Sequence, residues 1–263
     1  TLYSLTNHHS AEMFVITDFL RHISPETLDA YCASMKLDFM YPEGKSPKEA
    51  AEAFVGFMNG LSFNIRATIE LNFQEIQDIV GEKGSLMLIE EANIRNAELA
   101  KDFEDFSNYD KAIWFFLNQR DIFDQVAVEY EIEHSLGWLP YNVEYVAPEA
   151  VLGKEHELAD AVRKFYFETE YRGDICVAEC VEKDDFICYI AYPRDYVNRE
   201  ISYDEKEQLN KATHRQPVFK VFFLYSPAEQ RVSVKVRGGK LKKEALVKLF
   251  AENVLGQKLT EDN

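Results

Sequence analysis

The chain has little cysteine and no long apolar run, and each shortage excludes a class of protein. Only 4 cysteines occur among 263 residues, and no two of them form a Cys-x-x-Cys pair. Such a set is too small and too uneven for a disulfide scaffold, so it predicts a reducing compartment. The longest apolar runs, such as residues 113–117, are far shorter than the roughly 20 residues that span a bilayer. We therefore expect no membrane helix.

Signals for secretion and for several enzyme classes are also missing. The apolar stretch 13–18 is short, is interrupted by a carboxylate and has no basic lead, so we expect no secretory leader and a cytoplasmic location. Thr1 leaves open whether the native N-terminus is present. Gly238-Gly239-Lys240 precedes a predicted helix but lacks the spacing of a phosphate-binding loop. Neither the serine-nucleophile motif nor the paired-histidine zinc motif occurs, and we expect no cofactor.

Basic residues are scarce overall but concentrated near the end of the chain. The sequence holds 29 Lys+Arg against 46 Asp+Glu, a net charge of −17. Residues 213–263 carry 10 basic and 5 acidic residues, which leaves 19 basic and 41 acidic residues before them. Aromatic residues make up 13% of the chain, more than a disordered acidic tail would hold, so the acidity covers a folded body. Such asymmetry indicates binding partners rather than a fold.

The first part of the chain has the start and stop signals of helices. Ser24 and Ser46 each precede a proline, and Glu49 completes a capping box with Ser46. Further helices are predicted over residues 65–80, 86–103 and 109–130, with Ser107 as another capping serine. No repeat period is kept. We therefore predict an acidic all-helical domain over residues 1–140, which ends in the loop 137–140.

The second part, residues 141–263, has the pattern of an α+β domain. A helix is predicted over residues 148–171, strands over 174–181, 186–192, 218–225 and 231–237, and a last helix over 240–255 that Gly256 ends. The order α-β-β-β-β-α lacks the strand–helix alternation of a parallel sheet. It predicts an antiparallel four-stranded sheet flanked by helices.

The last predicted strand has one apolar and one basic face. Val232, Val234 and Val236 alternate with polar residues that would point the other way. Lysines of the following helix could extend that basic face, which would bind phosphate, nucleic acid or an acidic partner. The alternative is a solvated face that offsets the acidic body. The candidate binding residues are Arg231, Lys235, Arg237, Lys240, Lys242 and Lys243.

The second domain also holds three of the cysteines. Cys176 and Cys180 would share one face of a strand, and a turn near Asp184 would set Cys188 across from Cys180. With His214 these thiols could hold zinc, but the spacing fits no common pattern of zinc ligands. Small buried core residues are the simpler interpretation, and we predict no metal.

Charged residues around the strand ends are the candidates for catalysis. Asp174 and Glu179, with Glu182 and Lys183, are the nearest approach to a metal-dependent nuclease, although the acid–acid–lysine spacing of such enzymes is not met. His214 could form an acid–base pair with Glu179 or Asp195. Arg194 lies just after the predicted strand 186–192 and follows a proline, so its side chain would lie at the strand end. The competing interpretation is a charged turn and a structural histidine.

Short segments at the predicted strand ends resemble those of a known group of proteins. The stretch from Arg172-Gly173-Asp174 through Tyr192-Pro193 to His214-Arg215 resembles an uncharacterised group of bacterial intracellular proteins over about residues 150–255. The resemblance implies a bacterial intracellular origin and no activity.

The leading hypothesis from the sequence is an interaction or regulatory protein without catalysis. Its partner would be another protein, met through electrostatic complementarity. The first alternative is a metal-dependent nuclease or hydrolase with a site near Asp174, Glu179, Arg194 and His214. The second is a nucleic-acid-associated protein, which would bind through the basic terminal face or imitate DNA with its acidic body.

Overall fold

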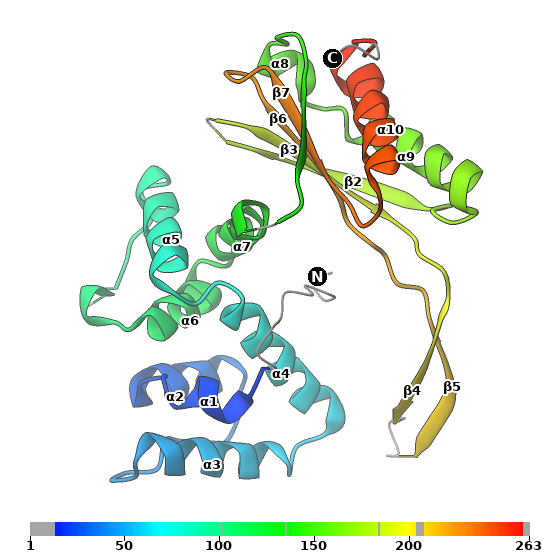
Figure 1. Ribbon diagram of the computed structural model, residues 1–263. Helices are drawn as coiled ribbons and strands as arrows, with labels where there is room; N and C mark the ends of the chain where they lie inside the picture. Colours follow the sequence, from blue (N-terminus) through cyan, green and yellow to red (C-terminus); the bar gives the residue numbers. More distant parts are fainter. Residues whose placement is uncertain (1–13, 101–102, 135, 184, 204–207, 260–263) are drawn as a thin grey trace. The chain divides into compact units, whose positions relative to one another are not determined.

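The computed structural model describes residues 14–100, 103–134, 136–183, 185–203 and 208–259 (Figure 1). The chain divides into two compact units, Thr1–His134 and Ser135–Asn263. Each unit has its own cluster of buried apolar side chains. The fold is therefore described unit by unit.

In the described part of the first unit the regular elements are helices. They are α1 (Ile16–Leu20), α2 (Pro25–Ser34), α3 (Pro47–Met58), α4 (Phe63–Gln77), α5 (Glu82–Ile94), the 3-10 turn η1 (Phe103–Asp105), α6 (Asn108–Asn118) and α7 (Arg120–His134). Where one helix was predicted over 109–130 there are two, because Gln119 leaves the helical region at φ −138° and ψ 59°. The core contains fully buried aromatic rings, among them Tyr31, Phe54 and Phe73.

The predicted helix starts use the expected caps. The Ser46 side chain accepts the Glu49 amide, and the Glu49 carboxylate accepts the Ser46 amide in return, so both arms of the capping box are present. Ser107 caps α6 by accepting the Asp110 amide at 3.1 Å. Asp110 is itself buried and accepts the Ser24 amide at 2.9 Å, which joins the starts of α2 and α6.

The second unit is an antiparallel sheet with helices, as predicted, but the sheet has five strands rather than four. The strands are β1 (Leu139–Asn142), β2 (Cys176–Glu182), β3 (Ile187–Pro193), β6 (Val221–Ser226) and β7 (Arg231–Lys235), in the order β1-β7-β6-β3-β2. The extra strand β1 is short and contains Pro140, and it pairs with β7, some ninety residues later. Local sequence patterns do not reveal such a distant pairing, and the Gly-Trp-Leu-Pro sequence around β1 is typical of a loop.

A second sheet was also missed. β4 (Asn198–Tyr203) and β5 (Leu209–Arg215) form a two-stranded antiparallel hairpin between β3 and β6. At the base of this hairpin an isolated antiparallel β-bridge pairs Arg194, which follows β3, with Val218, which precedes β6. The segment is polar and carries only a weak alternation, which explains why no strand was predicted there.

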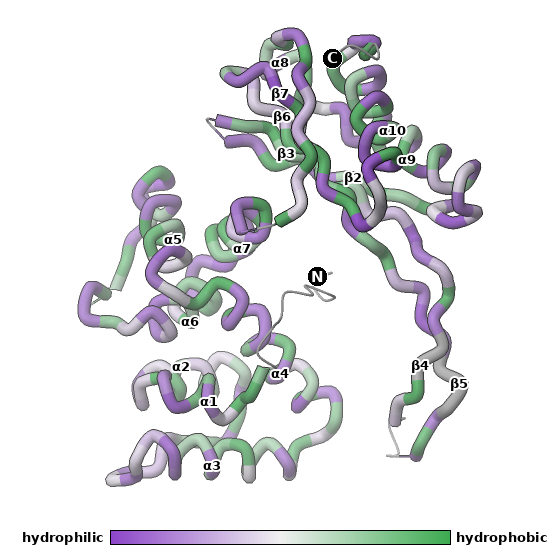
Figure 2. Tube along the Cα trace, viewed as in Figure 1, coloured by the Kyte–Doolittle hydropathy of each residue, from purple (hydrophilic) through white to green (hydrophobic). Residues whose placement is uncertain are grey.

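Helices cover one face of the five-stranded sheet. These are α8 (Pro148–Val151), α9 (Glu155–Glu170), α10 (Lys240–Phe250) and the π-helical turn η2 (Ala251–Leu255). The predicted helix 148–171 is divided between α8 and α9 around Gly153, whose φ is +74°. Hydrophilic and hydrophobic residues alternate along α9 and α10 (Figure 2), and both helices bury apolar residues in the core of this unit. Gly256 ends the last helix in a left-handed conformation, as predicted.

Alternation along β7 follows the predicted pattern. Val232, Val234 and Val236 belong to the buried cluster, whereas Arg231 and Arg237 are exposed. The helices and the valines therefore share one face of the sheet, and the alternate residues of each strand lie on the opposite face.

Candidate functional site

Asp174 and Arg194 form an ion pair where β2 begins and β3 ends. Arg194 Nε donates to Asp174 Oδ1 at 2.8 Å, and its Nη2 contacts the other carboxylate oxygen. Arg194 Nη1 also donates to Gln216 Oε1 at 3.3 Å. The hydrogen bonds from Arg194 hold the pKa of Asp174 below its usual range. Both side chains are thus engaged with each other, which is the geometry of a structural pair.

The other two candidates for catalysis are not joined to this pair. Glu179 lies five residues further along β2, about 16 Å from Asp174 in an extended strand, and accepts the Tyr192 hydroxyl at 3.0 Å. His214 lies in β5 opposite Arg199, in a different sheet from Glu179. Asp195, the other predicted partner of His214, is bound by Arg172 at 2.6 Å.

The three cysteines do not gather as predicted. In the register of β2 and β3, Cys188 lies opposite Val181, and Cys180 lies opposite Tyr189. A shift of one residue places the Cys188 side chain on the opposite face of the sheet from Cys176 and Cys180. Among the described residues no group of three or more His, Cys, Asp or Glu side chains could hold a metal ion.

Burial also makes the two remaining thiols unsuited to metal binding. It raises the pKa of Cys176 and of Cys180 to about 11. At neutral pH both are protonated, whereas zinc ligation and nucleophilic attack require the thiolate. These cysteines act as core residues between β2 and the helices.

The predicted basic residues are distributed over both faces of the sheet. Lys235 lies over the Phe222 ring at 4.9 Å from its centroid, on the face away from the helices. Lys242 instead contacts Glu170 at 2.5 Å on the helical face. Arg231 pairs with Glu229, Lys240 pairs with Glu244, and Lys243 donates to the Gly137 carbonyl. Arg237 is exposed. The single basic face expected from the sequence is thus divided between two faces, and binding through it stays a prediction.

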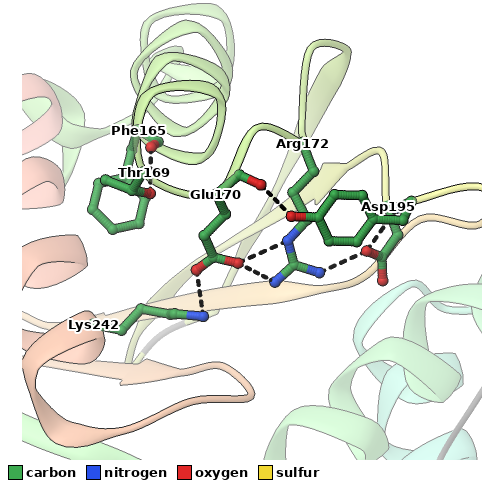
Figure 3. Close-up of polar contacts among 7 residues, drawn as sticks. Phe165, Thr169, Glu170, Arg172, Asp195 and Lys242 are labelled. Atoms are coloured by element: carbon green, nitrogen blue, oxygen red, sulfur yellow. Dashed lines mark hydrogen bonds and ion pairs between the residues drawn. The ribbon is translucent and has the colours of Figure 1, made fainter.

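Four charged side chains meet at the base of the hairpin (Figure 3). Arg172 donates to Glu170 through Nε at 2.8 Å and to Asp195 through Nη1 at 2.6 Å. Lys242 from α10 binds the second Glu170 oxygen. We call Glu170, Arg172, Asp195 and Lys242 the Arg172 network. It connects the end of α9, the start of α10 and the segment that enters β4.

Aromatic rings surround the guanidinium of this network. Arg172 lies 4.2 Å from the centroid of Phe219, 5.4 Å from that of Tyr166 and 5.5 Å from that of Tyr196, and its side chain is only 17% exposed. Burial opposes the charge of Arg172, but the hydrogen bonds that Arg172 donates to Asp195 and Glu170 outweigh it and raise the pKa of Arg172. Burial likewise opposes ionisation of Glu170, and the bonds from Lys242 and Arg172 together lower its pKa. Glu170 and Arg172 are therefore both charged at neutral pH, and the ion pairs of the network join α9, α10 and the segment before β4.

The backbone near the network is closely packed and hydrogen-bonded. Gly173 has φ +74°, and a Cβ there would lie 2.8 Å from the Tyr166 Cβ. Asp195 donates its amide to the Pro217 carbonyl at 2.7 Å, and Phe219 donates to the Pro193 carbonyl at 3.1 Å. Side-chain and backbone bonds together therefore fix both strands of the hairpin where they leave the sheet.

Beyond its base the hairpin exposes apolar side chains. Tyr203 and Leu209 are paired across the two strands, and Ile201 lies two residues before Tyr203, where the pairing of the strands is shifted. Their exposed fractions are 68% for Ile201, 66% for Tyr203 and 51% for Leu209. We call these three residues the hairpin face. Sequence reasoning missed them, and the only available signal was the alternation of Ile201 and Tyr203 in a polar stretch.

Comparison with known proteins gives no relative. No family model matches the chain, and neither a curated protein nor a solved structure matches it. In the described part of the chain no helix has the length and apolar character that a membrane crossing requires. The resemblance to bacterial intracellular proteins stays a prediction.

Proposed function

We propose that this protein binds another protein through the hairpin face and acts by interaction rather than by catalysis. The observation that carries the proposal is the exposure of Ile201, Tyr203 and Leu209 on a hairpin whose base is held by partly buried ion pairs. A solvent-exposed apolar cluster on an element outside the core is typical of an interaction site. In the hairpin face, Tyr203 and Ile201 would supply the apolar contact area.

The anchoring of the hairpin supports this proposal. An isolated two-stranded hairpin is only marginally stable in water, so its shape depends on its attachments. The Arg172 network and the Arg194–Asp174 pair supply them at its base. An apolar face held in a defined position loses less conformational entropy on binding than a free loop would.

Charge indicates the chemistry of the partner. The chain carries a net charge of −17, most of it in the first unit, so a basic protein would be attracted over a long range and a strongly acidic one repelled. We therefore propose a basic protein partner in the cytoplasm. The interaction would weaken as salt rises, because screening shortens the reach of the attraction.

The test is a binding measurement with substitutions in the hairpin face. The tagged chain is used to isolate its partner from the native host at moderate salt, and the affinity of the purified pair is measured by calorimetry. The double variant Ile201→Ser with Tyr203→Ser should weaken binding by roughly tenfold or more. Leu241→Ser, at a leucine on α10 that is 82% exposed, serves as the control and should not weaken it.

An unchanged affinity of the double variant would overturn the proposal. The enzymatic alternative makes a different prediction, because metal-dependent cleavage of nucleic acid would then be lost in both Asp174→Ala and Glu179→Ala. The nucleic-acid alternative predicts salt-sensitive oligonucleotide binding that disappears when the charges of Lys235 and Arg237 are reversed.

A further inference from the structure

The outer edge of β2 has no strand beside it in the described part of the chain. β2 ends the five-stranded order, and among the described residues its seven residues pair only with β3. The Ile175 carbonyl accepts the Arg194 amide, and the Lys183 amide donates to the Phe186 carbonyl. In an antiparallel pair, alternate residues direct both backbone groups to the partner strand. The backbone groups of odd-numbered residues therefore point to β3, and those of Cys176, Ala178, Cys180 and Glu182 point outward.

Apolar and acidic side chains accompany these outward groups. Ile175 and Val177 are 54% and 59% exposed, and they lie on the same face as Glu179. Glu182 is also exposed and lies on the other face. We call the outward backbone groups with these four side chains the β2 edge. It combines unpaired hydrogen-bonding groups with apolar contact area and two carboxylates.

We propose that the β2 edge binds an extended segment of another protein as an added sixth strand. Every pair in this sheet is antiparallel, and antiparallel addition continues that pattern. An antiparallel neighbour runs against β2, so its first position lies opposite Glu182 and its fourth position lies opposite Glu179. Its sixth and eighth positions then lie opposite Val177 and Ile175. The segment therefore carries the pattern basic-x-x-basic-x-apolar-x-apolar, read from its N-terminus.

The same charges disfavour a second copy of this chain as the occupant. Antiparallel pairing of two copies centred on Glu179 sets that carboxylate against its counterpart, and pairing centred on Ala178 sets Glu182 against Asp174. Each copy also brings a net charge of −17. Carboxylates on an edge strand are a common protection against pairing between copies, and they leave a basic segment as the favoured neighbour.

The first test uses a synthetic eight-residue peptide with the full chain. The peptide has lysine at positions one and four, valine at six and eight and threonine elsewhere. Its binding is followed by the hydrogen exchange of individual amides in NMR spectra. On binding, the outward amides of Ala178 and Cys180 should exchange at least about tenfold more slowly. The amides of Val177 and Glu179, which already face β3, should change much less.

The second test exchanges the charges. Glu179→Lys combined with Glu182→Lys should weaken the lysine peptide by roughly tenfold and make a glutamate version of it the tighter ligand. Glu252→Lys, an exposed carboxylate on η2, is the control and should leave the preference unchanged. The hairpin variant Ile201→Ser should also bind the peptide normally, so a failure of the proposed hairpin function is distinguishable from a failure here.

Two outcomes overturn the inference. One is peptide binding without protection of Ala178 and Cys180, or no binding at all. The other is a dimer, measured by sedimentation, that Glu179→Lys abolishes and that excludes the peptide, because the occupant would then be a second copy.

Discussion

Two tyrosines in the core of the second unit illustrate how differently a buried hydroxyl can be used. The Tyr189 hydroxyl donates to the Val151 carbonyl at 2.6 Å and accepts the Lys154 amide at 3.1 Å. Tyr166 is fully buried, but no hydrogen-bond partner for its hydroxyl exists in the described part of the chain. Burial raises the pKa of both phenols, so both stay neutral. Tyr189 connects the sheet to the α8–α9 turn, whereas Tyr166 contributes only its ring to the core and to Arg172.

This contrast predicts opposite effects of the same substitution. Tyr189→Phe leaves a buried carbonyl and an amide without partners and should lower the free energy of unfolding by about 1–3 kcal/mol. Tyr166→Phe removes an unsatisfied hydroxyl and should be neutral or raise that free energy by up to about 1 kcal/mol. Urea denaturation of both variants measures the difference. Equal losses would show that the Tyr166 hydroxyl has a role that its surroundings do not indicate.

At the scale of elements, the Arg172 network decides how the hairpin is attached. The network draws one residue from α10, two from the end of α9 and its following turn, and one from the segment before β4. In the described part of the chain the hairpin forms its own two-stranded sheet and pairs with no strand of the five-stranded one. The strength of its base therefore controls the position of the hairpin face.

The ionisation of Glu170 makes this attachment sensitive to acid. The folded-state pKa of Glu170 is lower than its ordinary value of 4.5, so its contribution to stability is present above that pH and is lost as pH falls through the lower folded value. Lys242→Met removes one of the bonds that lower the pKa while burial persists. In this variant the pKa of Glu170 should rise, and the contribution should be lost at higher pH.

Carbon-detected NMR titration of the Glu170 carboxyl measures this shift. Lys240→Met is the matched control, because Lys240 pairs with Glu244 and should leave Glu170 unchanged. Identical titration of Glu170 in the wild-type chain and in Lys242→Met would contradict the role given to Lys242.

At the scale of the whole molecule, the described residues form two separate buried clusters, one in each unit. Each cluster is closed by elements of its own unit, and each unit is long enough to bury a core by itself. We expect fragments 1–134 and 135–263 to fold independently. Each should show a cooperative urea transition and dispersed amide NMR signals. A fragment with native-like helicity but poorly dispersed signals would show that its core needs the other unit.

The sequence determined the features that depend on near neighbours. The capping serines Ser46 and Ser107 were predictable because a cap needs only residues three positions away. The alternation of valines in β7 likewise predicted its buried face, and Gly256 predicted the end of the last helix. Mixed helix and antiparallel sheet followed from the order of these patterns.

Tertiary structure alone decided everything that depends on pairing between distant residues. β1 became a strand through β7, and a shift of one residue between β2 and β3 turned Cys188 away from Cys180. The Arg172 network joins residues up to 72 positions apart, and Lys242 belongs to it instead of to the predicted basic face. Register and long-range ion pairs are set by which surfaces pack together, and that choice follows from the sum of many contacts.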